Sequence, residues 1–159
     1  LRQVATEVGA TLIINDRCDL ALAVKADGVH LGQDDLPLAD ARQILGPEAI
    51  IGLSTHNAKQ VREAVALQPD YIGFGPIFGT TTKTDHDPVV GLEGLRAART
   101  LTTLPIFAIG GITSQHVTDL TAAGADGVAV ISAILKAQDL EAAIRSFQPP
   151  PSTQARPSH

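Results

Sequence analysis

Short apolar segments alternate with helix-like segments along the chain, and this alternation limits the fold more than any other feature. The apolar segments lack the polar–apolar alternation of half-exposed strands, so we expect strands buried on both faces of a parallel sheet. They are Thr11–Asn15, Gly28–Leu31, Ile50–Ser54, Tyr71–Gly75, Ile106–Ile109 and Gly127–Ile131. The helix-like segments are Leu20–Lys25, Leu38–Leu45, Ala58–Leu67, Leu92–Leu101, Ser114–Ala123 and Leu140–Phe147. Strand–helix alternation of this kind predicts βαβ units.

Turn residues mark the joints between these segments. Asn57 stands where a helix N-cap is expected, and Gly46 and Gly124 stand where C-terminal glycine caps are expected. Asp27 and Asp126 each follow an alanine and precede Gly-Val at the start of a strand. Asp70 holds the same position in Pro-Asp-Tyr-Ile, and we interpret all three aspartates as turn residues on the non-catalytic face.

The number of strands and the length of the chain together predict the fold. The chain has 159 residues, the size of one domain. A complete (β/α)8 barrel takes roughly 200 residues or more. Six strands in this length therefore predict a TIM barrel that lacks its first two strands, over residues 1–147. The segment 148–159 has four prolines and no periodicity, and we expect it to be disordered.

Composition excludes several classes of partner. The net charge is −5 and no basic stripe is present, which argues against nucleic acid. No apolar run approaches the roughly 18–20 residues that span a bilayer, and no signal peptide pattern is found. Cys18 is the only cysteine, which suits a reducing, cytoplasmic location. No His or acid stands in a pairing motif with Cys18, which disfavours it as a nucleophile.

Polar residues and glycines follow every predicted strand. In a parallel barrel these ends share one face, and polar groups there indicate binding or catalysis. Asp16 and Asp35 follow successive strands and predict a site for Mg²⁺ shared with substrate phosphates. Three alternatives remain: Asp16 could be a helix N-cap, Asp34 could exchange roles with Asp35, and the two could belong to a solvated loop before Pro37.

Phosphate is the expected ligand of the later strand ends. The loop 78–85 contains four threonines and Lys83, which suit phosphate oxygens, although a merely flexible loop has the same composition. A Schiff-base role for Lys83 is disfavoured because its neighbours are polar. The glycine pair Gly110-Gly111 and the later Ser132 each precede a helix-like segment, as in barrel phosphate sites. We expect a phosphorylated small molecule as substrate.

Two histidines lie close to these strand ends. His30 is inside an apolar strand, and we interpret it as a packed or supporting histidine rather than a ligand. His56 follows Ser54 at a strand end, where contact with substrate and a purely structural role are equally compatible with the sequence.

With these residues in place, the chain resembles the thiamine phosphate synthase family over about residues 1–147. Each matching segment is weak alone, but together and in this order they are specific. The segments are INDR at 14–17, ADGVHLGQDDLP at 26–37, GLSTH at 52–56, DYIG at 70–73, GPIF at 75–78, TTTK at 80–83, AIGGI at 108–112, ADGV at 125–128 and ISAI at 131–134.

The resemblance implies an activity and a role for each matched position. The family joins an aminopyrimidine diphosphate to a thiazole phosphate, and the pyrimidine–diphosphate bond is understood to ionise before the thiazole nitrogen attacks. Asp16 and Asp35 match the Mg²⁺ ligands. The positions that hold the pyrimidine diphosphate and serve catalysis match Asn15, Ser54 and Lys83. The positions that hold the thiazole phosphate match Thr80, Thr81, Thr82, Gly111, Ile131 and Ser132.

The resemblance also has a departure and two rivals. The family carries a Gln-x-Arg-x-Lys strand that has no counterpart here, so we expect a truncated copy with weak or no activity. A thiazole tautomerase is the first rival, but it would not need the loop Thr80–Lys83 for diphosphate departure. An inactive domain that only binds thiazole phosphate or a partner chain is the second. A homo-oligomer is compatible with the sequence.

Overall fold

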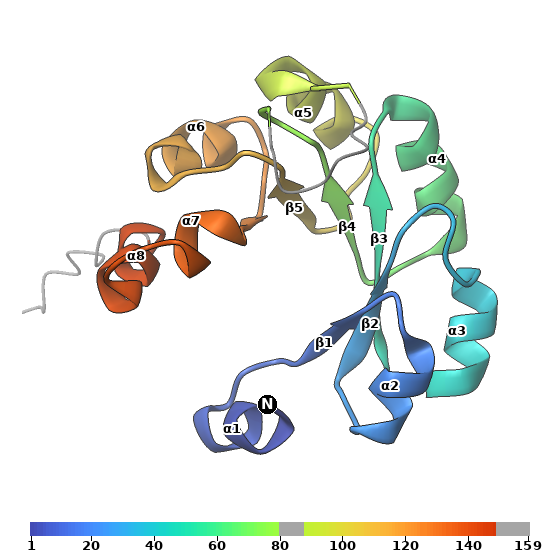
Figure 1. Cartoon of the computed structure of the whole chain (residues 1–159). Coiled ribbons are helices and arrows are strands. Elements are labelled where there is room, and N and C mark those ends of the chain that lie inside the picture. The colour runs from blue at the N-terminus through green and yellow to red at the C-terminus, as the bar shows by residue number, and fades with distance from the viewer. Residues whose placement is uncertain (80–87, 149–159) are drawn as a thin grey trace, which may run out of the picture.

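The computed structural model describes residues 1–79 and 88–148. Its strands form one sheet of six, paired in parallel and in chain order (Figure 1). The strands are β1 (Ile13–Asn15), β2 (Gly28–Leu31), β3 (Ile50–Thr55), β4 (Tyr71–Phe74), β5 (Ile106–Ile109) and β6 (Gly127–Ala129). In this part of the chain β1 and β6 each pair on one side, so the sheet is an open, curved part of a barrel. The predicted fold class and the six strands are confirmed.

The helices are α1 (Arg2–Val8), α2 (Cys18–Ala23), α3 (Leu38–Leu45), α4 (Ala58–Leu67), α5 (Gly91–Arg99), α6 (Val117–Ala122), α7 (Ser132–Leu135) and α8 (Leu140–Ser146), with a 3₁₀ turn η1 (Ser114–His116) before α6. Helices α2 to α6 cover the outer face of the curved sheet, whereas α1 lies beyond one end of it and α7 and α8 lie beyond the other (Figure 1). Asn57 caps α4 as predicted, because its Oδ1 accepts a hydrogen bond from the Gln60 N–H at 3.0 Å. Gly46 ends α3 at a φ of 93°, which favours glycine.

The core lies between the sheet and these helices, and each strand contributes alternate residues to it. On β5, for example, Ile106 and Ala108 are fully buried, whereas Phe107 and Ile109 are half-buried and face the other way. The helices contribute buried residues such as Val61 and Leu95. We predicted that both faces of the sheet are buried. This is correct for the face that packs against the helices, whereas the inner face lines a cavity.

Two helix predictions differ from the structure. The segment predicted as one helix from Ser114 to Ala123 is a 3₁₀ turn followed by α6, because Thr113 and His116 form a capping box that tightens the first turn. The helix α7 was not predicted, since four residues are too few to show a helical period. The predicted strand Gly127–Ile131 ends at Ala129, and the chain turns into α7.

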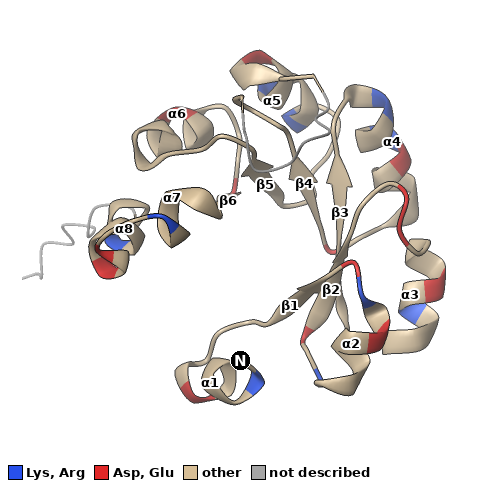
Figure 2. Cartoon of the chain, in the orientation of Figure 1, with Lys and Arg blue, Asp and Glu red and all other residues tan. Residues whose placement is uncertain are grey.

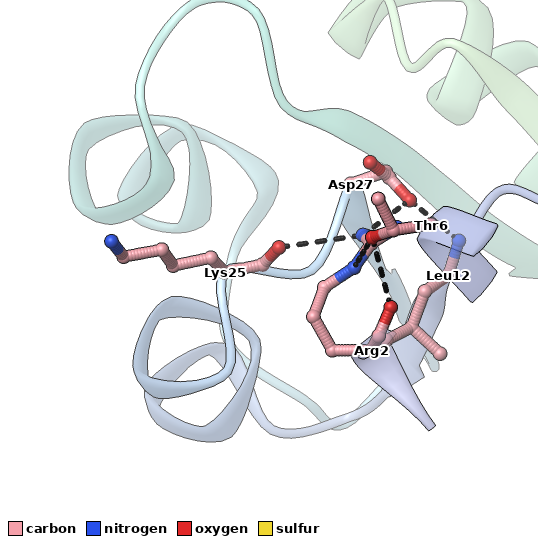
Figure 3. A network of polar contacts seen from close by, with 5 residues as sticks. All are labelled: Arg2, Thr6, Leu12, Lys25 and Asp27. Atoms are coloured by element: carbon pink, nitrogen blue, oxygen red, sulfur yellow. Dashed lines mark hydrogen bonds and ion pairs between the residues drawn. The ribbon is translucent and has the colours of Figure 1, made fainter. Parts of the chain in front are cut away.

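The aspartates that precede β2, β4 and β6 all make the same pair of contacts. Asp27 shows the pattern: its Oδ2 accepts from the Leu12 N–H at 2.6 Å and from the Arg2 guanidinium at 2.8 Å (Figure 3). Each aspartate thus contacts the start of the preceding strand and an arginine of the helix that comes before that strand in the chain. These contacts confirm the interpretation of turn chemistry at the amino ends of the strands. The other two sets are Asp70 with Ile51 and Arg42, and Asp126 with Ile106 and Arg99.

The contacts of Asp27 and Asp70 also lower the pKa of these two carboxyls. Burial alone would raise the pKa of Asp70, but the N–H of Ile51 and the guanidinium of Arg42 outweigh it, and the pKa lies below its usual value. At Asp27 the Leu12 N–H and then Arg2 lower the pKa in the same way. A carboxyl with a lowered pKa in the folded state stabilises the fold above its ordinary pKa and loses that contribution as the pH falls.

We predict that Asp70→Asn lowers the free energy of unfolding by about 1 kcal/mol at pH 7, because one charge-assisted, half-exposed pair of contacts is weakened. The difference from the unmodified chain should shrink as the pH falls below about 4, where the carboxylate is also lost from the unmodified chain. Urea unfolding at several pH values measures it. Glu48→Gln, at an exposed position, is the control. A loss that does not change with pH would contradict the electrostatic explanation.

Candidate active site

The inner face of the sheet lines one cavity of ≈ 920 Å³. Side chains from all six strands contribute to it, together with the turns that follow β5 and β6. The polar residues among them are Thr11, Asn15, His30, Ser54, His56, Tyr71 and Ser132. A cavity of this size accommodates a small molecule with two rings or a ring and a diphosphate.

Three aromatic rings cross the cavity side by side. The rings of His30 and Tyr71 stack with centroids 5.4 Å apart, and Phe107 meets Tyr71 edge to face at 5.2 Å. They come from β2, β4 and β5 and give the cavity an aromatic, mostly apolar wall. Such a surface suits a planar heteroaromatic ligand.

Glycines inside the strands make room for these rings. A Cβ on Gly52 would stand 2.1 Å from the Tyr71 ring, and a Cβ on Gly127 would stand 2.7 Å from the Phe107 ring. Glycine normally weakens a strand, so its presence at two such positions marks a close approach. Tyr71 and Phe107 were not predicted as site residues, and the facing strand glycines were the signal that could have found them.

A hydrogen-bonded chain joins three of the polar lining residues. The Nε2 atom of His30 lies 2.9 Å from the Oγ of Ser54, and its Nδ1 atom lies 3.0 Å from the Tyr71 hydroxyl. These contacts agree with the interpretation of His30 as a packed or supporting histidine, although its ring also lines the cavity. Burial raises the pKa of Tyr71, with a further contribution from Asp70, so the phenol is neutral at pH 7.

The two predicted magnesium ligands follow the neighbouring strands β1 and β2, at the carboxyl edge of the sheet (Figure 2). Asp16 adopts φ 63° and its N–H donates to the His30 carbonyl at 2.8 Å. Asp35 is half-buried, and its Oδ2 accepts from the Gly32 N–H at 2.6 Å. Asp16 directly follows Asn15, which lines the cavity, but neither carboxylate is part of the lining.

The structure bears on two alternatives, that Asp16 is a helix N-cap and that Asp34 exchanges roles with Asp35. The N-cap of α2 is Arg17 rather than Asp16. Asp35 turns back onto the end of β2, whereas Asp34 is exposed, so the two are not equivalent. Asp35 is also close enough to the start of α2 for its charge to act on Cys18.

The glycine pair after β5 adopts a conformation that other residues rarely take. Gly110 has φ 85° and Gly111 has φ 64°. A Cβ on Gly111 would stand 2.5 Å from the Gly79 carbonyl oxygen, and the Phe78 N–H donates to the Gly110 carbonyl at 3.1 Å. The segment that leads into the threonine loop thus lies directly against this glycine pair.

The remaining predicted positions divide into two groups. The structure gathers five of them around the one cavity: Asn15, Ser54, Gly111, Ile131 and Ser132. Ser132 begins α7, next to the exposed Ile131. The other four positions, Thr80, Thr81, Thr82 and Lys83, lie outside the described residues. His56 also lines the cavity, where its Nδ1–H donates to the Gly75 carbonyl at 2.6 Å.

Nucleophilic catalysis by the thiol of Cys18 finds little support in the structure. Cys18 is buried, and burial, followed by the charges of Asp19 and Asp35, raises the pKa of its thiol, which disfavours the reactive thiolate. Within residues 1–79 and 88–148 no three metal-binding side chains cluster together. No helix in the described part of the chain is long and apolar enough to cross a membrane.

Comparison with known proteins identifies the family. The model of thiamine monophosphate synthases matches residues 1–134. The chain is 50% identical to the thiamine-phosphate synthase of Chloroflexus aurantiacus over 93% of its own length and 68% of the relative's, and 50% identical to that of Moorella thermoacetica over 93% and 70%. The thiamine phosphate pyrophosphorylase structure from Pyrococcus furiosus superposes with a TM-score of 0.83 and 40% identity, over 92% of this chain and 69% of that one. With six strands, cavity and motifs in agreement, the chain belongs to the thiamine monophosphate synthase family.

Proposed function

We propose that this chain joins an aminopyrimidine diphosphate to a thiazole phosphate and releases thiamine phosphate and diphosphate. Family membership makes the chain a transferase of thiamine biosynthesis. The observation that carries the specific reaction is the convergence of matched positions from separate strand ends. Asn15, Ser54, Gly111 and Ser132 follow or end four different strands, yet they line one cavity.

The cavity offers two sides that suit the two substrates. Asn15 and Ser54, with Lys83 from the loop, would hold the pyrimidine diphosphate near β1 to β3. The thiazole phosphate would occupy the opposite side, at the turns after β5 and β6. Its contacts would be Gly111, Ile131, Ser132 and, from the loop, Thr80, Thr81 and Thr82.

The residues at the rim fit a magnesium ion. Carboxylate oxygens are the ligands Mg²⁺ prefers, and the ion usually takes one or two of them together with waters and substrate phosphates. Asp16 and Asp35 supply two carboxylates on neighbouring loops, and the Gly32 N–H holds that of Asp35 in place. When bound, Mg²⁺ would neutralise charge on the diphosphate.

The chain's own groups would then act by charge and orientation. Lys83 and Asn15 would stabilise the negative charge that gathers on the departing diphosphate. The aromatic surface of His30, Tyr71 and Phe107 would hold a planar ring beside it. Anchoring of the thiazole phosphate would bring the ring nitrogen toward the pyrimidine methylene carbon, which is an orientation effect. The single, buried thiol agrees with a cytoplasmic location.

Mixing both substrates with the 159-residue chain and Mg²⁺ tests the proposed function. We expect diphosphate and thiamine phosphate in equal amounts. Isomerised thiazole phosphate without diphosphate would instead indicate a tautomerase. Binding of thiazole phosphate by calorimetry, with no product at any Mg²⁺ concentration, would indicate a binding domain. A parallel assay of a fusion that carries the N-terminal strands of a relative gives the rate with which the rate of the 159-residue chain is compared.

We predict that Asp16→Asn and Asp35→Asn each lower the rate of diphosphate release by about 10²-fold or more. Each change would weaken the binding of Mg²⁺, which would then no longer neutralise the charge on the departing diphosphate. Asp34→Asn is the matched control for Asp35→Asn and should keep nearly full activity. The rates are measured over a series of Mg²⁺ concentrations. Equal losses from the changes at Asp34 and Asp35 would contradict the assignment.

We predict that Gly111→Ala raises the KM for thiazole phosphate at least tenfold, because a Cβ there meets the Gly79 carbonyl and moves the loop. Gly9→Ala is the control, since Gly9 has a similar φ of 67° but nothing within 4 Å of its Cβ position. Both changes should cost about 1 kcal/mol of stability for the left-handed backbone. If the two variants have the same KM for thiazole phosphate, Gly111 does not shape the phosphate site.

A further inference from the structure

His56 directly follows β3 and makes a hydrogen bond whose direction is fixed by its acceptor. The Nδ1 atom lies 2.6 Å from the carbonyl oxygen of Gly75, which directly follows β4. A carbonyl oxygen only accepts, so Nδ1 carries the hydrogen whether the ring is neutral or charged. Because β3 and β4 pair in parallel, this bond joins the carboxyl ends of two neighbouring strands.

The His56 ring supplies a donor where the backbone ladder between β3 and β4 stops. The Gly75 N–H still donates to the Thr55 carbonyl at 3.2 Å, but β3 ends at Thr55 and Asn57 already caps α4. Gly75 is buried, and a buried carbonyl without a donor is costly. The ring of His56 therefore contributes to holding Gly75 in its place.

Backbone groups hold the residues that follow Gly75. The carbonyls of Pro76 and Ile77 accept from the N–H groups of Val90 and Gly91, at the start of α5, at 2.9 and 3.2 Å. A substitution of His56 removes its side-chain bond and leaves these backbone partners in place. The contribution of the His56 ring can therefore be measured separately.

The other side of the same segment presses on the turn that follows β5. A Cβ on Gly75 would stand 2.2 Å from the Ile109 carbonyl oxygen. A Cβ on Gly110 would stand 2.5 Å from the Pro76 Cβ. The Ile77 N–H also donates to the Ile109 carbonyl at 2.8 Å. With contacts this close, the position of Gly75 and Pro76 determines the position of Gly110.

We propose that His56 is a positioning residue for the thiazole phosphate, because its bond to Gly75 keeps the segment 75–78 against the turn Gly110-Gly111. This role rests on the proposed function, which places the phosphate at that turn. Gly111 itself lies against the segment, since a Cβ there would stand 2.8 Å from the Phe78 carbonyl oxygen. His56 thus acts through the backbone of its neighbours.

The bond also connects the two sides of the cavity. His56 follows Ser54 by two residues, on the side where the pyrimidine diphosphate is proposed to bind, and the segment 75–78 reaches the turn on the thiazole side. The distance between the two substrates therefore depends on this contact. A small displacement of one reactant relative to the other lowers the rate, so the contact supports the orientation that the reaction needs.

Calorimetric binding of thiazole phosphate to the 159-residue chain and three variants tests this role. In His56→Asn the Nδ2–H group can take the place of Nδ1–H, whereas the amide of His56→Gln reaches the position of Nε2. We expect His56→Ala and His56→Gln to weaken binding about tenfold, because the buried carbonyl loses its donor and the turn moves. His56→Asn should restore most of the affinity, and binding of the aminopyrimidine diphosphate should change little in all three. Circular dichroism checks the fold, and the Asn and Gln variants decide the question if His56→Ala does not fold.

The backbone amides of Gly110 and Gly111 give a second readout, in ¹H–¹⁵N spectra of the chain without substrate. We expect both signals to shift in His56→Ala and to return toward their original positions in His56→Asn. The amide of Gly9, which has nothing within 4 Å of its Cβ position, is the internal reference and should not move. Long-range ¹H–¹⁵N correlation should show a protonated Nδ1 on His56.

Three results would overturn the proposal. The first is rescue of thiazole phosphate binding by His56→Gln rather than His56→Asn, which would assign the role to Nε2 and to direct contact with substrate. The second is equal binding in all variants and the unmodified chain. The third is unchanged amide signals of Gly110 and Gly111 in His56→Ala. Failure of the proposed function would appear separately, as binding of both substrates without diphosphate release.

Discussion

Parallel pairing of six strands in chain order is the constraint on which the rest of the molecule depends. It places every carboxyl end at one edge, so short loops far apart in the sequence become neighbours. The register sets Asn15 beside His30 and Ser54 beside Gly73. A shift of one residue would turn His30 and Ser54 toward the helices and bury their polar atoms without partners. The cavity and its hydrogen bonds therefore follow from strand register.

The inner face shows how the sheet combines packing with an open site. Strands of three to six residues cannot fill the interior with large side chains from every position. Tyr71 and Phe107 instead occupy space above the glycines of neighbouring strands, Gly52 and Gly127. The entropy that a strand glycine costs is offset by the area that each ring buries against backbone. The same rings then form the aromatic wall of the cavity, so one set of contacts serves both the stability of the sheet and the shape of the site.

The sequence predicts the strands well because each is a short apolar segment between turn residues, and five of six predicted strands begin at the observed residue. The residues at strand ends are predictable for the same reason. The pattern of a segment that is apolar throughout does not show which way each residue faces, so Tyr71 and Phe107 were missed, and only the strand glycines Gly52 and Gly127 indicated large rings nearby. Contacts between residues far apart in the sequence are equally hard to predict. Nothing near Asp126 in the sequence indicates that Arg99, 27 residues earlier, contacts it.

The aspartates at the two edges of the sheet make different kinds of contact. At the amino edge, Asp27, Asp70 and Asp126 meet arginines 25, 28 and 27 residues earlier in the chain. These contacts join the strands in pairs, β1 with β2, β3 with β4 and β5 with β6, each through one ion pair and one backbone amide. The carboxylate of Asp35, at the carboxyl edge, instead accepts a hydrogen bond from the backbone N–H of Gly32. The proposed magnesium ion would bind at this edge, and the ion pairs of the other edge would remain intact.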